Sequence, residues 1–188
     1  MKNNKKDIIF LLNAKEVFIS NQAEIQIFKL IKWIKKFDNK NIIVRFHPSD
    51  NEKRINYIQN KFKNTKIIFH YPKKITLMQS VKNSVVAIGI RSSSLIEISK
   101  LGIIPIILND NEALLENNFN DIKKIGLTHD NIRDTKKILN KIFLNSNYCS
   151  KKISQVSRIG NKYIKFTDER SKNIINEQLK YLKLTNEL

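Results

Sequence analysis

The sequence predicts one α/β domain built around a parallel sheet. Short runs of apolar, β-branched residues alternate along the chain with segments whose apolar residues recur at helical spacing. The run at 85–90 is apolar and rich in β-branched residues, with Gly89 inside it, which is typical of a strand buried on both faces. With 188 residues, of which 41% are hydrophobic, the chain is long enough for one well-buried core. We therefore expect a single Rossmann-like domain over residues 1–188, with helices on both faces of the sheet.

The expected elements follow from these patterns in chain order. Apolar runs predict strands at 7–12, 42–46, 66–69, 85–90 and 103–108, with a short edge strand at 122–126. Amphipathic spacing predicts helices at 21–37, directly after 49–52, around 77–81, at 94–101, 112–116 and 131–143, within 148–165 and at 168–184. Capping boxes are expected at Ser49–Glu52 and Ser94–Glu97, and Thr128 or Asp130 is expected to cap the helix at 131–143. The helix at 168–184 is expected to pack back on the sheet.

The most informative stretch is 84–108, where an apolar strand changes abruptly into a polar turn. Arg91 and three serines, Ser92, Ser93 and Ser94, stand between this strand and the helix that follows it. Hydroxyls and the free N–H groups of a first helical turn are suited to binding a phosphate. The alternative is an ordinary turn that happens to begin with serines.

Polar residues follow the ends of three predicted strands. His47 follows the strand at 42–46, His70 follows that at 66–69, and Arg91–Ser94 follow that at 85–90. The carboxyl ends of parallel strands lie along one edge of a sheet, and such sheets bind their ligands there. We therefore expect these three groups to lie along one edge of the domain.

The net charge of +18 suggests anionic partners, but its make-up weakens that interpretation. There are 29 lysines and only 6 arginines, together with 32 isoleucines and 24 asparagines, and the lysines are spread along the whole chain. We therefore expect the lysines to form a solvated basic surface. Binding to an anionic membrane surface or an anionic substrate is the second choice, and binding to nucleic acid is disfavoured. The single Cys149 and the lack of a long apolar run favour a cytoplasmic protein, at most peripheral at the inner membrane.

The run IIVRFHPSD, followed by GIRSSSLIEISKLGIIP, resembles a known type of enzyme. It is similar to the C-terminal, donor-binding half of GT-B glycosyltransferases that make bacterial surface polysaccharides. The families concerned carry an HP motif and a Ser-Ser motif: bacterial sialyltransferases and polysialyltransferases, and capsule Kdo-transferases. The resemblance covers residues 42–108 and implies that the domain binds a nucleotide-activated sugar, with a CMP-linked acidic sugar as the expected donor.

The resemblance implies roles for the motif residues. His47 would contact the donor phosphate and help the leaving group depart, which suits an imidazole because it titrates near neutral pH. Ser92 and Ser93 would hold the same phosphate, whereas Ser94 fits the capping box better. The alternative for His47 is a structural residue at a strand end.

Three further residues are candidates for donor binding. Glu97 would contact the donor ribose, although it fits equally well as a capping carboxylate. Arg91 would neutralise a phosphate or a sugar carboxylate, and His70 would lie near the nucleoside. The histidines have no metal-ligand spacing and no D-x-D pair occurs, so neither a cofactor nor a metal ion is expected. The chain also lacks G-x-S-x-G, Walker A and GxGxxG motifs.

The sequence departs from those families in one respect. Their general base comes from an N-terminal domain, in an acidic motif ending in glycine that this sequence does not show. A second half-domain, in another chain or preceding this one, is therefore an expected partner if the protein is an enzyme. Two alternatives stay open: a non-catalytic basic module that binds an anionic polymer or membrane, and a fragment of a nucleotide-sugar epimerase.

Overall fold

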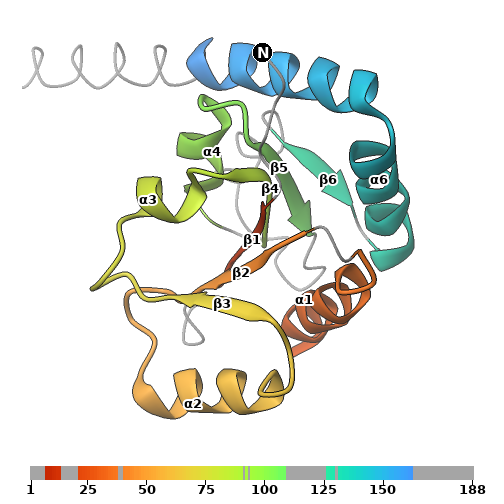
Figure 1. Cartoon of the computed structure of the whole chain (residues 1–188). Helices are drawn as coiled ribbons and strands as arrows, with labels where there is room; N and C mark the ends of the chain where they lie inside the picture. Colours follow the sequence, from red (N-terminus) through yellow and green to blue (C-terminus); the bar gives the residue numbers. More distant parts are fainter. Residues whose placement is uncertain are drawn as a thin grey trace, which may run out of the picture.

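A six-stranded parallel sheet in the order β3-β2-β1-β4-β5-β6 forms the centre of the domain (Figure 1). The computed structural model describes residues 7–13, 21–37, 40–90, 92, 94–108, 126–129 and 131–162. The predicted Rossmann-like fold, with helices on both faces of a parallel sheet, is confirmed.

The strands and helices lie close to the predicted positions. The strands are β1 (Asp7–Leu11), β2 (Ile42–Arg45), β3 (Ile67–His70), β4 (Ser84–Gly89), β5 (Ile104–Leu108) and β6 (Leu127–His129). The helices are α1 (Asn21–Ile34), α2 (Glu52–Lys61), α3 (Leu77–Val81), α4 (Ser94–Ser99) and α6 (Ile132–Leu144), followed by a helix at 146–162. No helix in these described segments is long and apolar enough to cross a membrane.

The sheet separates two apolar cores, which explains why its central strands are apolar after their first residues, Asp7 of β1 and Ser84 of β4. Ile8 and Phe10 of β1 face the larger core, which α1, α2 and α6 cover. Ile9 and Leu11, on the opposite face of the same strand, lie in the smaller core, which α3 and α4 cover. All five residues of β1 and all six of β4 are buried. A strand enclosed in this way has no solvent-facing side on which a polar residue would be favourable.

The helix at 146–162 crosses the edge of the sheet where the strands begin. It extends from the end of α6 towards the end of α4 (Figure 1). There Ser157 Oγ donates a hydrogen bond to the Lys100 carbonyl oxygen at 3.1 Å, and Gly160 packs directly against Ser99 and Lys100. This helix therefore closes the amino edge of the sheet, opposite the carboxyl edge.

Two predicted helix caps are wrong. The N-cap of α2 is Asn51, whose Oδ1 accepts the Arg54 N–H at 3.0 Å, because Ser49 is held by His47 instead. The N-cap of α6 is Asn131, whose Oδ1 accepts the Asp134 N–H at 2.9 Å, rather than Thr128 or Asp130.

Other predictions fall at or beyond the limits of the described residues. The last strand is β6 at Leu127–His129, C-terminal to the predicted 122–126, of which only Gly126 is described. The predicted helices at 112–116 and 168–184 lie outside the described residues, as do Arg91 and Ser93.

Candidate functional site

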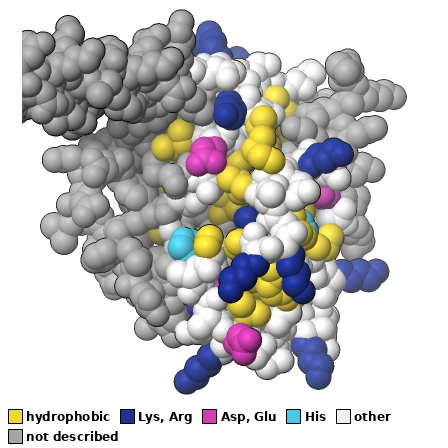
Figure 2. Space-filling model, turned by 90° about the vertical axis from the view of Figure 1, so that its left-hand side faces the viewer, with side chains coloured by type: hydrophobic (Ala, Val, Ile, Leu, Met, Phe, Trp, Pro, Cys, Tyr) yellow, Lys and Arg dark blue, Asp and Glu magenta, His cyan; other side chains and the backbone are white. Residues whose placement is uncertain are grey.

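A cavity of about 240 Å³ lies at the carboxyl edge of the sheet. Its walls come from the ends of β1 and β2, the start of α3 and the turn between β4 and α4. The described residues that line it are Leu11, Leu12, Arg45, Phe46, His47, Pro48, Leu77, Ser92 and Ser94. In Figure 2, which faces the left-hand side of Figure 1, hydrophobic side chains gather near the centre of the surface with basic side chains and histidine beside them.

The strand order explains why two motifs distant in sequence share this cavity. β1 pairs with β2 on one side and with β4 on the other. Neighbouring strands are about 4.8 Å apart, so the ends of β2 and β4 are separated by only roughly 10 Å. His47, which follows β2, and Ser92, which follows β4, therefore reach the same space.

The ring of His47 is oriented by the turn that follows it. The backbone N–H of Ser49 donates to His47 Nδ1 at 3.2 Å, and Ser49 Oγ lies 2.8 Å from the same nitrogen. A backbone N–H can only donate, so Nδ1 accepts and the neutral ring carries its proton on Nε2. An Nε2–H group is therefore available to a ligand oxygen.

A buried ion-pair network supports the turn that carries His47. The His47 N–H donates to Asp50 Oδ2 at 2.8 Å. Asp50 Oδ1 lies 3.0 Å from Arg54 Nη1, an ion pair whose geometry falls short of a hydrogen bond. Arg54 also bonds Glu24 Oε1 at 3.0 Å and the Asn13 carbonyl oxygen at 2.8 Å. The network thus joins the end of β1, the start of α1 and the start of α2.

Burial dominates the electrostatics of this network. The Asp50 side chain is only 1% exposed, and burial raises the pKa of its carboxyl although the His47 N–H and the Arg54 charge both act to lower it. Asp50 was not predicted from the sequence, because the Ser49–Glu52 capping box offered a simpler explanation of that turn. Arg54 was not predicted either, because a cation within an amphipathic helix usually faces solvent.

Arg45 is a second cation that the sequence analysis did not select. Its Nη1 donates to the Ile75 carbonyl oxygen at 2.8 Å and to Ser80 Oγ at 2.6 Å, which ties β2 to the α3 segment. Burial lowers the pKa of the Arg45 guanidinium below its usual value. The sequence did hold a signal for Arg45, because it stands two residues before His47 at the end of an otherwise apolar strand. Alternate residues of a strand share a face, so Arg45 and His47 could be expected on the same side of the sheet.

The remaining predicted site residues lie in different places. Ser92 and Ser94 line the cavity, whereas Glu97 and His70 do not. Glu97 is exposed on α4. Burial, followed by the nearby charge of Arg45, lowers the pKa of His70, whose Nδ1 has no hydrogen-bond partner among the described residues. Within these same segments no three His, Cys, Asp or Glu side chains come together as a metal site.

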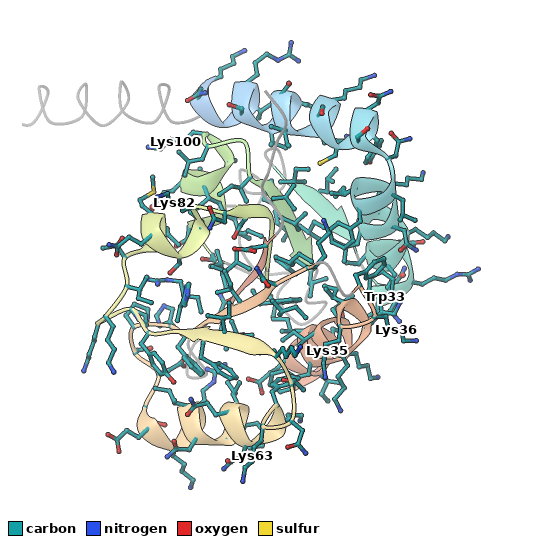
Figure 3. The ribbon with its side chains drawn as sticks, in the orientation of Figure 1. Trp33, Lys35, Lys36, Lys63, Lys82 and Lys100 are labelled. Carbon is teal, nitrogen blue, oxygen red and sulfur yellow. The ribbon has the colours of Figure 1, made fainter. Side chains whose placement is uncertain are left out.

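Exposed lysines follow the C-terminal ends of four helices, away from the cavity. They are labelled in Figure 3: Lys35 and Lys36 after α1, Lys63 after α2, Lys82 after α3 and Lys100 after α4. Cations are favoured at these positions because the carbonyl end of a helix is partly negative. Lys63 therefore serves as a control position for the experiments below.

Comparison with known proteins adds a structural likeness. No protein-family model and no curated protein matches the sequence. A UDP-GlcNAc 2-epimerase from Neisseria meningitidis, bound to UDP-GlcNAc, gives a TM-score of 0.60 at 13% identity, covering 92% of this chain and 45% of that chain. The spinosyn rhamnosyltransferase SpnG, complexed with thymidine diphosphate, gives a TM-score of 0.56 at 9% identity, covering 83% of this chain and 42% of that chain. A variant of the wall teichoic acid polymerase TagF gives a TM-score of 0.52 at 18% identity, covering 94% of this chain and 45% of that chain.

These likenesses define the class of fold. The epimerase and both transferases have GT-B-type folds, and the chain spans less than half the length of each. The described domain therefore has the fold of one half of a GT-B-type protein. At such low sequence identities the likeness concerns the fold alone.

Proposed function

We propose that this domain binds the nucleotide part of a nucleotide-activated sugar, as the donor half of a GT-B glycosyltransferase does. The observation that carries the proposal is the cavity in which His47, Ser92 and Ser94 meet, and whose lining includes no carboxylate among the described residues. Hydroxyl and imidazole groups without a competing anion favour a phosphate ligand. The epimerase bound to UDP-GlcNAc and SpnG with thymidine diphosphate support this choice of ligand.

Each residue has a distinct role in the proposal. His47 donates its Nε2–H to a phosphate oxygen and stabilises the charge that develops there as the sugar leaves. Ser92 and Ser93 hold the same phosphate with their hydroxyls, and Arg91 adds positive charge. The Asp50–Arg54 network keeps His47 in place.

The cavity can hold only part of such a ligand. Its volume of about 240 Å³ lies below the range of roughly 300–1,000 Å³ that is usual for small-molecule sites. The rest of the donor would extend past the edge of the sheet, where Glu97 and His70 stay candidates for nucleoside contacts. A second half-domain would cover it and supply the general base.

The finer proposal concerns the donor and the pathway. By its resemblance to the HP-motif and Ser-Ser-motif families, the domain would use a CMP-linked acidic sugar in the synthesis of a bacterial surface polysaccharide. A nucleotide-sugar epimerase is the second candidate, favoured by the likeness to the epimerase from Neisseria meningitidis. A preference for UDP-GlcNAc over CMP-linked sugars would support the epimerase.

A thermal-shift panel with CMP, UDP, GDP and their sugars tests the proposal. One nucleotide should raise the melting temperature with at least about tenfold preference, and at 100 times its Kd it should add roughly 2.7 kcal/mol of stability. Ser92→Ala should weaken that binding by about 0.5–1.5 kcal/mol, the net contribution of one hydrogen bond. Lys63→Ala, at the opposite edge, should leave binding unchanged.

Two results would overturn the proposal. The first is a folded protein that none of these nucleotides stabilises. The second is nucleotide binding that Ser92→Ala and His47→Ala leave at the level of the unsubstituted protein.

A further inference from the structure

The guanidinium of Arg45 is only partly satisfied by the protein. Its Nη1 makes the bonds to Ile75 and Ser80, and lies 3.5 Å from the Thr76 carbonyl oxygen. A guanidinium has five N–H donors, of which Nη1 carries two. The three donors on Nε and Nη2 have no hydrogen-bond acceptor in the described part of the chain. Arg45 also lines the cavity in which the proposed ligand would bind.

Arg45 has no anionic partner among the described residues. The ion pairs found there join Arg54 to Glu24, Arg54 to Asp50, and Lys137 to Asp134. The oxygens that hold Arg45 are two carbonyls and a hydroxyl, all neutral. A partly buried cation without a counter-ion is costly, and an anion that enters the cavity would remove part of that cost.

The contacts to the α3 segment fix the orientation of the guanidinium. Ser80 is 2% exposed and its bond to Nη1 is partly buried, and the Ile75 carbonyl oxygen holds the same nitrogen. A cation held on one side and unpaired on the other is preorganised for a ligand. The Nε–Nη2 edge is also the planar fork that binds two oxygens of one phosphate.

We propose that Arg45 is the residue that recognises the donor phosphate, with its Nε–Nη2 edge bonded to two phosphate oxygens in the cavity beside His47 and Ser92. The inference rests on the proposed function and goes beyond it, because it assigns the main positive charge of the site to the end of β2. Bound phosphate and the α3 segment would then share one guanidinium, so nucleotide binding also stabilises residues 75–80.

Calorimetry with paired ligands tests this role. UDP and uridine, CMP and cytidine, and inorganic pyrophosphate are titrated into the unsubstituted protein, Arg45→Gln, Arg45→Lys and Ser80→Ala. Arg45→Gln should weaken binding of the preferred nucleotide about 10- to 100-fold and that of its nucleoside less than about twofold, because the lost bonds are to charged oxygens. Ser80→Ala removes one bond to Arg45 but no charge, and should weaken nucleotide binding less than about threefold.

Arg45→Lys keeps the positive charge, and it provides a second test if Arg45→Gln fails to fold. A lysine ammonium cannot hold the α3 segment and bind two phosphate oxygens together, so we expect a loss of about 5- to 20-fold for the nucleotide alone. Equal nucleotide affinity in Arg45→Gln and the unsubstituted protein would overturn the role of Arg45, and a loss in Ser92→Ala would then still support the proposed function. An unsubstituted protein that binds neither nucleotide nor pyrophosphate would overturn both.

Discussion

Removal of the Arg54 guanidinium should destabilise the domain strongly at neutral pH. The Arg54 side chain is 9% exposed and faces an Asp50 side chain that is 1% exposed, with 3.0 Å between the charged atoms. Arg54→Met keeps much of the volume but leaves a buried carboxylate without its cation. Loss of one partner of a buried pair costs about 3–5 kcal/mol. At roughly 2–4 °C for each kcal/mol in a chain of this size, the melting temperature should fall by about 6–20 °C.

The loss should depend on pH in a defined direction. Burial already raises the pKa of Asp50, and Arg54 acts against that rise, so the pKa should rise further in Arg54→Met. A carboxyl whose pKa is higher in the folded than in the unfolded state costs stability once it ionises, above the folded pKa. That cost disappears as the pH falls below the unfolded value. The deficit should therefore be largest near about pH 7.5 and smaller near about pH 4.

Urea denaturation at both pH values measures this deficit. Lys53→Met changes an exposed cation in the same helical turn and should alter stability by no more than about 0.5 kcal/mol. Adding Asp50→Asn to Arg54→Met should recover part of the loss, because the uncompensated charge is then absent. An Arg54→Met deficit below about 1 kcal/mol, or one of equal size at both pH values, would show that the Asp50 carboxylate does not depend on Arg54 for its compensation.

Three other predictions use separate features of the domain. Gly160→Ala should lower stability by about 1–3 kcal/mol in denaturation experiments, because the added Cβ would collide with Ser99 Oγ. Nucleotide affinity should not change, and a stabilised variant would contradict this packing. Burial raises the pKa of the Cys149 thiol, so alkylation at neutral pH should be slow in the folded protein and faster in urea; equal rates would contradict its burial. Burial and the Arg45 charge lower the pKa of His70, so the midpoint of its NMR titration should lie below that of an ordinary histidine. The domain should lose stability as acid protonates this ring, and a raised midpoint would be inconsistent with this environment.

The sequence predicted the sheet well because the signal for buried parallel strands is local. β5 and the part of β4 after Ser84 are runs of apolar residues, and both strands are buried at every position. The meeting of His47 with Ser92 was also predictable, since both follow strand ends in a parallel sheet.

The caps and the buried cations could not be predicted in the same way. Both Ser49 and Asn51 are good N-cap residues, and the contact of Ser49 with His47 decides between them. The partners of Arg45 and Arg54 include Ile75 and Glu24, each 30 positions away along the chain. Only the packed structure shows that these two cations are held inside the domain.

The central claim is that nucleotide binds in the cavity between the His47 turn and Ser92. An NMR titration of isotopically labelled protein with UDP and with CMP, at about 150 mM salt to screen the surface lysines, tests it most directly. We expect saturable shifts at His47, Leu77 and Ser92, and no shift at Lys63. Shifts confined to the lysines at the helix ends, or no shifts at all, would contradict it.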